Sequence, residues 1–124
     1  MIRITALLVA SALVLAGCSG TTEVTESDDG GSVSVGVGDE FTVALPANPS
    51  TGFTWVVALI DADVFEQIDE TEFEPQSDAL GAGGILTYHF EGRAEGSGQL
   101  VLEYRRPFED AAPEATFTLT VTVG

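Results

Sequence analysis

The sequence predicts an all-β domain: an immunoglobulin-like antiparallel β-sandwich of about seven strands, without a disulfide. Apolar and polar residues alternate along most of the chain, which is typical of half-buried strands. Clusters of glycine and proline separate these short segments, and no stretch has a sustained helical period. The 124 residues include one cysteine, so no intramolecular disulfide can form. Two sheets packed face to face account for this pattern.

The composition allows one domain and excludes two classes of partner. A hydrophobic fraction of 44% is sufficient for a modest core. The chain has 20 acidic residues against 4 basic ones, a net charge of −16. This charge repels the phosphates of nucleic acid and anionic membrane surfaces, so neither is expected as a partner. No long uncovered apolar edge is present in the pattern, and we expect a monomer.

The N-terminal segment resembles a lipoprotein signal. Arg3 precedes an apolar run over residues 6–15, which is too short for an ordinary spanning helix and has the length of a signal-peptide core. The sequence Leu-Ala-Gly then leads to Cys18 and resembles the lipobox of prokaryotic lipoproteins. The resemblance implies that residues 1–17 are removed and that Cys18 is lipidated, anchoring the chain at an extracytoplasmic membrane face. An ordinary secretory signal with a leftover thiol is the alternative.

Residues 18–32 are predicted to be the lipidated cysteine and a flexible acidic tether. Gly, Ser, Thr, Asp and Glu make up nearly all of this segment, and a single valine cannot bury enough surface for a fold. The folded domain is then expected over residues 33–124.

Seven segments of alternating pattern are expected to form the strands. The last is the most regular, because threonines alternate with apolar residues along its length. Trp55 and Tyr104 are expected to be the largest parts of the core. Residues 61–64 are expected to form a short helical turn. The expected inward-facing residues are Val33, Val35 and Val37; Phe41, Val43 and Leu45; Trp55, Val57 and Leu59; Phe65, Ile68 and Phe73; Leu86, Tyr88 and Phe90; Leu100, Leu102 and Tyr104; and Phe117, Leu119, Val121 and Val123.

Three long connections are expected to lie together at one end of the sandwich. If each strand crosses the sandwich once, the second, fourth and sixth connections emerge at the same end. These are residues 46–52, 75–84 and 105–115, which carry the strongest proline and glycine signals in the chain. Function mounted on a sandwich is usually found where loops cluster.

The first of these connections has the properties of a rigid binding tip. Pro49 fixes its own φ and biases Asn48 toward an extended conformation. Gly52 supplies the freedom that a tight reversal needs. The strand that follows, residues 53–60, is aromatic and β-branched. A loop that is ordered before contact lowers the entropy cost of binding, although an ordinary Asn-Pro turn would explain this stretch taken alone.

Together the three connections resemble the loop motifs of the chagasin family, tight-binding inhibitors of papain-like cysteine proteases. The motifs are Asn-Pro-Ser-Thr-Gly-Phe-Thr-Trp at 48–55, Leu-Gly-Ala-Gly-Gly at 80–84 and Arg-Pro-Phe at 106–108, in the family's order and spacing. The resemblance covers residues 33–124 and implies an inhibitor that wedges three loops into a protease cleft, without cofactor or metal. The residues that it assigns to protease binding are Asn48, Pro49, Ser50, Thr51, Gly52 and Phe53; Leu80, Gly81, Ala82, Gly83 and Gly84; and Arg106, Pro107 and Phe108.

The resemblance also implies a role for each motif. The first would lie over the catalytic cysteine and histidine, with hydroxyls from Ser50 and Thr51. The glycines of the second would present backbone groups unobstructed by Cβ atoms, and the third would stack its aromatic ring on the enzyme. Two positions depart from the family pattern: Phe108 stands where tryptophan is usual, and Ser50 where threonine is common. The smaller ring offers less area and no indole N–H.

Other function classes are weaker interpretations of the sequence. His89, the only histidine, is expected to point away from the row that contains Tyr88, and no nucleophile is placed to pair with it. The acidic residues at 61–63 and 109–110 could bind calcium, but the glycine and terminal glutamate of an EF-hand loop are missing. An adhesion or other binding lipoprotein domain is the main alternative, because the sandwich fold hosts many roles.

Overall fold

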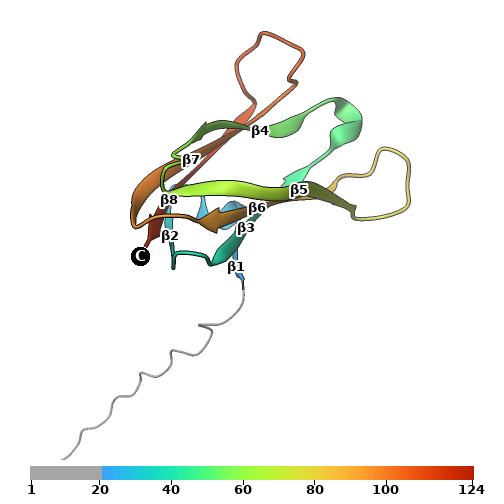
Figure 1. Cartoon of the computed structure of the whole chain (residues 1–124). Helices are drawn as coiled ribbons and strands as arrows, with labels where there is room; N and C mark the ends of the chain where they lie inside the picture. Colours follow the sequence, from blue (N-terminus) through green and yellow to red (C-terminus); the bar gives the residue numbers. More distant parts are fainter. Residues whose placement is uncertain (1–20) are drawn as a thin grey trace, which may run out of the picture.

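The computed structural model describes residues 21–124 and has two packed β-sheets (Figure 1). One sheet has the strand order β1-β3-β6-β5, and the other β2-β8-β7-β4. The elements are β1 (Thr22–Thr25), the 3-10 turn η3 (Glu26–Asp28), β2 (Ser32–Val35), β3 (Glu40–Ala47), the 3-10 turn η4 (Pro49–Thr51), β4 (Thr54–Ile60), β5 (Phe65–Pro75), β6 (Gly84–Gly92), β7 (Gly96–Arg105) and β8 (Ala115–Val123). The predicted immunoglobulin-like sandwich is confirmed, with eight strands in place of about seven.

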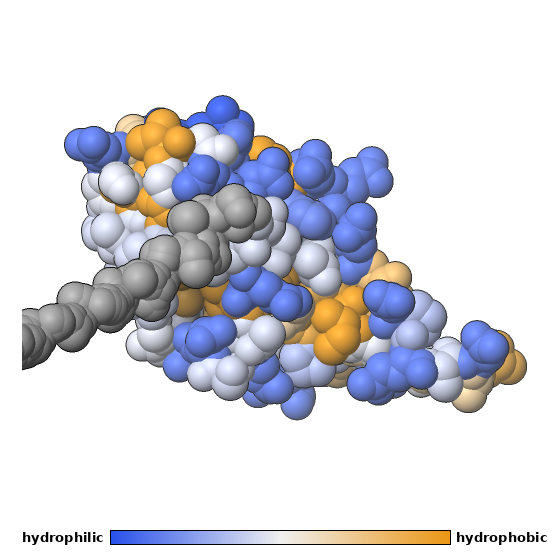
Figure 2. All heavy atoms as spheres, turned by 90° about the horizontal axis from the view of Figure 1, so that it is seen from below, coloured by the Kyte–Doolittle hydropathy of each residue, from blue (hydrophilic) through white to orange (hydrophobic). Residues whose placement is uncertain are grey.

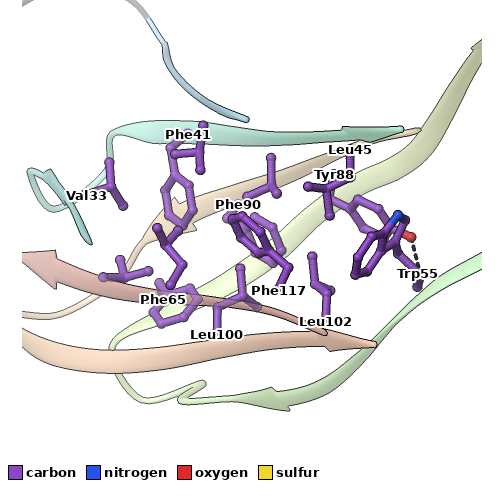
Figure 3. Packing of buried hydrophobic residues seen from close by; sticks show 14 of the residues in the cluster. Val33, Phe41, Leu45, Trp55, Phe65, Tyr88, Phe90, Leu100, Leu102 and Phe117 are labelled. Carbon is purple, nitrogen blue, oxygen red and sulfur yellow. Dashed lines mark hydrogen bonds between the residues drawn. The ribbon is translucent and has the colours of Figure 1, made fainter. Parts of the chain in front are cut away.

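Side chains from the inner faces of both sheets fill the core (Figure 3). Its largest fully buried members are Phe41, Phe65, Phe90 and Phe117. The rings of Phe41 and Phe90 stack with their centroids 5.2 Å apart. The expectation that Trp55 is a large member of the core is confirmed, since it is buried at 7% exposure. The same expectation is wrong for Tyr104, which is only partly buried and packs against the cluster.

The segment predicted to be a tether contributes an edge strand. β1 pairs in parallel with β3, and Val24, opposite Val43, is only 3% exposed. η3 then carries the chain to the other sheet, where β2 pairs in parallel with β8. The tether prediction is thus wrong for residues 22–32, and the folded domain includes Thr22. The sequence pattern does not indicate this strand, because a four-residue edge strand needs only one buried side chain. Its hydrogen bonds to the neighbouring strand use backbone groups, which do not depend on residue type. Residues 1–17 and Cys18 lie outside the described residues.

A register shift in β4 brings a residue that was predicted to be buried to the surface. The pairing of β4 with β7 shifts by one residue between Val57 and Leu59, and Leu59 is 48% exposed. Since side chains alternate between faces, a shift of one residue turns the next side chain to the other side.

In β5, the predicted inward orientation of Ile68 is wrong, because Ile68 pairs with His89 on the outer face of β6. Phe73 pairs with the buried Leu86 and so faces inward as predicted, but it is 38% exposed near the end of β5. Val37 is exposed for a simpler reason, because β2 already ends at Val35.

Apart from the connection that contains η3, the connections fall into two groups at opposite ends of the sandwich (Figure 1). The first loop (residues 48–53), the second loop (residues 76–83) and the third loop (residues 106–114) gather at what we call the loop end. Residues 36–39, 61–64 and 93–95 form the closed end. Strand register fixes this division, because Ala47 and Pro75 both pair with Gly84, and Thr54 pairs with Arg105. The prediction that three loops share one end is confirmed.

Candidate functional site

The first loop is a short 3-10 turn that closes on itself. Asn48 caps it, since its Oδ1 accepts hydrogen bonds from the Ser50 backbone N–H at 3.2 Å and from the Ser50 hydroxyl at 2.6 Å. The Thr51 hydroxyl donates to the Asn48 carbonyl at 2.6 Å. Gly52 ends the turn in the left-handed region, with φ of 88°, and its N–H donates to the Pro49 carbonyl. The two hydroxyls that the family resemblance assigns to the target are thus already engaged within the loop.

The second loop lies against the first. The Asn48 side-chain Nδ2 donates to the Gly81 carbonyl over 3.0 Å. Gly81 has a φ of 76°, and a Cβ at Gly83 would lie 3.3 Å from the Ala47 carbonyl oxygen. A hollow of about 270 Å³ lies beside this contact, and its lining includes Asn48, Gly83 and Tyr104. Leu80 is fully exposed at the tip of this loop, and the protrusion at the right of Figure 2 ends in hydrophobic surface.

Gly84 does not belong to the exposed tip. It is buried at the start of β6, and a Cβ there would lie 2.1 Å from the Glu74 carbonyl oxygen. Because glycine has no Cβ, β6 can pair closely with β5 at this position. The assignment of Gly84 to the contact surface is therefore corrected to a structural role.

The third loop contacts the first from the other side. The Arg106 Nε donates to the Thr51 carbonyl over 3.0 Å. A Cβ on Gly52 would lie 3.2 Å from Cζ of Phe108, so a glycine here leaves room for the third loop. Phe108 itself is 74% exposed. The neighbouring Arg105 closes the third loop on itself, because its Nη2 donates to the Ala111 carbonyl over 2.7 Å.

Side chains beneath the loops join them to the core. The Tyr104 hydroxyl accepts from the Asn48 backbone N–H over 3.0 Å, and the Trp55 indole N–H donates to the Pro46 carbonyl over 3.0 Å. Tyr88, on the opposite sheet, donates its hydroxyl to the Trp55 carbonyl (Figure 3). Burial raises the pKa of Tyr88 to about 12, and a hydrogen bond with the Thr54 side chain acts in the opposite direction.

The loop end is acidic in character. Glu109, Asp110 and Glu114 are exposed on the third loop, and Asp78 is exposed on the second. The two arginines there are engaged with carboxylates: Arg105 lies 3.0 Å from Glu103, and Arg106 lies 3.4 Å from Glu109. Any partner surface that meets this end therefore faces a negative field.

The residues considered for other functions do not form a site. His89 is on the outer face of β6, as predicted, and its Nε2 lies 3.2 Å from Oε1 of Glu72. Asp61 has a structural role at the closed end, where it accepts from the Gln99 N–H over 2.7 Å. Within residues 21–124, no group of three or more His, Cys, Asp or Glu side chains could hold a metal ion. The same part of the chain contains no helix long and apolar enough to cross a membrane.

Tyr104 is the residue of this end that sequence reasoning did not assign to the site. Its alternation with Leu102 marked it as a core residue, and its ring is in fact partly buried. The signal that could have identified it is its place as the last aromatic before the Arg-Arg-Pro stretch, at the end of a strand. A hydroxyl at that position reaches the loop end.

Comparisons with known proteins agree with this geometry. A family model described as "Chagasin family peptidase inhibitor I42" matches residues 34–123. Amoebiasin-1 of Entamoeba histolytica is 34% identical over 104 residues, covering 81% of this chain and 97% of that protein. Chagasin of Trypanosoma cruzi is 32% identical over 90 residues, covering 69% of this chain and 82% of that protein.

A solved structure is similar in fold. The cysteine protease inhibitor EhICP2 from Entamoeba histolytica superposes with a TM-score of 0.73 at 25% sequence identity. The match covers 84% of this chain and 96% of that one. The similarity therefore extends over the whole sandwich and both of its ends.

Proposed function

This chain belongs to the chagasin family of peptidase inhibitors and is not an enzyme, and we propose that it inhibits papain-like cysteine proteases by occupying their active-site cleft with the three loops. The observation that carries this proposal is that the loops are joined to one another. Asn48 binds the Gly81 carbonyl on one side, and Arg106 binds the Thr51 carbonyl on the other. The loop end is therefore a single preordered surface, with the first loop at its centre.

The shape of this surface suits an extended cleft. The first loop would enter the catalytic centre, while the second and third loops would lie along the rims. Leu80 and Phe108 are the large exposed apolar residues of the two flanking loops, and such residues supply anchors at interfaces. Three loops of this size are compatible with a protease–inhibitor interface of standard size, roughly 800 Å² per partner.

The closed form of the first loop explains why binding would inhibit the enzyme and not lead to cleavage. The loop is held by the Asn48 cap and by the Thr51 hydroxyl, so its peptide bonds cannot extend along the cleft without breaking these bonds. Pro49 and Gly52 further limit the backbone. Preordering also lowers the entropy cost of association.

The first test is a titration of papain with the purified protein, followed by residual activity. We expect stoichiometric inhibition of papain and no inhibition of trypsin, whose mechanism uses a serine. Leu80→Glu at the loop end should weaken inhibition, whereas Val37→Glu, which also replaces an exposed apolar residue but at the closed end, should not. Unchanged papain activity in molar excess of the protein would contradict the proposal and favour an adhesion or binding role.

We also propose that the protein is a lipoprotein, anchored through Cys18 to the extracytoplasmic face of a prokaryotic membrane. Support comes from the lipobox-like sequence and from the position of β1, which begins four residues after Cys18. Thr22 pairs with Phe41, close to the closed end. An anchor just before β1 would then leave the loop end pointing away from the membrane. Cys18→Ser should move the protein from the membrane fraction to the soluble fraction, and an unchanged distribution would contradict the anchor.

We further propose that the protein is a monomer. β5 is an edge strand, and its exposed side chains include Glu66, Glu70 and Glu72. Repeated carboxylates on an edge oppose its pairing with a second copy. Light scattering coupled to size exclusion should give the monomer mass at micromolar concentration; the mass of a dimer would contradict this.

A further inference from the structure

An uninterrupted stack of side chains runs from the core to the first loop. The Trp55 ring centroid is 5.1 Å from that of Tyr104, and the Tyr104 centroid is 5.3 Å from that of Phe53. The guanidinium carbon of Arg106 lies 4.6 Å from the centroid of Phe53. We call these four residues the aromatic column. The Phe53 ring therefore packs against both Tyr104 and Arg106.

The column holds the first loop by its backbone at two points. At the start of the loop, the Tyr104 hydroxyl accepts from the Asn48 N–H. At its far side, the Arg106 Nε donates to the Thr51 carbonyl. The residues of the turn between these points have no buried side chain of their own. The turn is therefore not held by side chains of its own in the core, and the aromatic column connects it to the core instead.

From these contacts we propose that Tyr104, Phe53 and Arg106 are positioning residues that fix the inhibitory shape of the first loop. The inference rests on the proposed function and deepens it. The family resemblance assigns Phe53 and Arg106 to the contact surface. In the structure, however, the Phe53 ring already contacts Tyr104 and Arg106, and the Nε of Arg106 already donates to the Thr51 carbonyl.

The chemistry of arginine suits this role. A planar guanidinium stacks on an aromatic face and donates in its own plane at the same time, whereas a lysine ammonium cannot combine these two geometries. The two interpretations of Arg106 therefore make different predictions. If Arg106 acts as a charge toward the protease, Arg106→Lys retains inhibition. If it positions the first loop, Arg106→Lys and Arg106→Ala both weaken inhibition.

The first experiment needs no protease. Amide hydrogen exchange of Thr51 and Gly52, measured in the free protein, should be about 10-fold to 30-fold faster in Arg106→Ala, the factor that corresponds to losing one hydrogen bond and one cation–π contact. In Arg106→Lys, which can keep only one of the two contacts, exchange should be about threefold to tenfold faster. Arg93→Ala is the matched control, because Arg93 pairs with Glu66 and Glu91 away from the loops and its loss changes the net charge equally. Exchange in this control should equal that of the wild type.

The second experiment measures the complex with papain. Arg106→Ala should dissociate about 10-fold to 30-fold faster, and Arg106→Lys about threefold to tenfold faster. Papain should cut both variants between residues 48 and 53 on prolonged incubation, while the wild type stays intact. Tyr104→Phe, which removes only the hydroxyl, should show a smaller change of the same kind. Thermal unfolding of each variant checks that the sandwich is retained.

The outcomes separate the two proposals. Wild-type protein that leaves papain active would overturn the proposed function, yet the exchange result would still test the column. Wild-type inhibition together with unchanged exchange and unchanged dissociation in Arg106→Ala would overturn the positioning role alone. Full inhibition by Arg106→Lys, with exchange as in the wild type, would instead assign Arg106 to the contact surface.

Discussion

Three connections lie at the loop end and three at the closed end, apart from the one that contains η3, and different chemical groups hold the two sets together. At the closed end, backbone groups join neighbouring connections: the Gly38 N–H donates to the Gly92 carbonyl, the Gly92 N–H donates to Asp39, and the Arg93 N–H donates to Val64. At the loop end of the described chain, the bonds between loops involve side chains, chiefly those of Asn48 and Arg106.

This difference separates stability from recognition. Backbone bonds form with almost any residue type, provided that the chains approach closely, and glycine permits that approach. Side-chain bonds depend on residue identity and geometry. We therefore expect substitutions at the closed end to change the free energy of unfolding, and substitutions at the loop end to change inhibition.

The largest expected effect concerns the layer beneath the loop end. Tyr88 donates to the Trp55 carbonyl and so links the two sheets. Burial raises its pKa from 10.0 to about 12, so the folded state holds this proton more tightly than the unfolded state. The protonated Tyr88 therefore makes its full contribution to the free energy of unfolding below pH 10. This contribution, about 3 kcal/mol in total, is lost as the pH rises toward 12. Denaturant unfolding of the wild type and of Tyr88→Phe, compared at several pH values, checks this: the variant should lack this dependence.

A glycine substitution at the closed end should come next. A Cβ on Gly92 would lie 2.7 Å from the Gly36 carbonyl oxygen and 3.0 Å from Val123 Cγ1. Gly92→Ala should lower the free energy of unfolding by about 1–3 kcal/mol, while the folded protein inhibits papain as the wild type does. Weakened inhibition with an unchanged free energy of unfolding would contradict the claim that the closed end affects stability and the loop end affects inhibition.

The matched substitution at the loop end is Gly52→Ala. Gly52 combines a φ of 88° with a predicted Cβ contact of 3.2 Å to Phe108. The left-handed conformation costs an alanine about 1–2 kcal/mol, and an exposed loop can release this strain by changing its shape. We therefore expect roughly tenfold weaker inhibition, with a free energy of unfolding that falls by no more than this cost. Inhibition equal to that of the wild type would contradict this expectation.

The smallest expected effect is a gain. Phe108 is exposed, in a position where the family resemblance implies tryptophan. Phe108→Trp adds ring area and an indole N–H, and we expect inhibition to be about threefold tighter, from roughly 0.6 kcal/mol of added contact. Inhibition constants for papain measure this, and Phe73→Trp, an exposed ring on β5, is the control.

The sequence predicted those features that depend on local pattern. Alternation identified β2 to β8, and counting strands placed the three loops at one end. It did not reveal β1, because Val24 is the one buried residue of that strand. It also could not show the bonds between loops, since Asn48 and Gly81 are 33 positions apart and Thr51 and Arg106 are 55 positions apart. Such contacts depend on register and on bulges, which the pattern does not encode.

The most direct test of the central claim is hydrogen exchange of the whole chain, measured free and saturated with papain. We predict added protection in residues 48–53, 80–83 and 106–108, and none in residues 36–39, 61–64 and 93–95. Protection centred on the closed end, or spread over the outer faces of the sheets, would contradict the claim that the three joined loops are the surface that binds the protease.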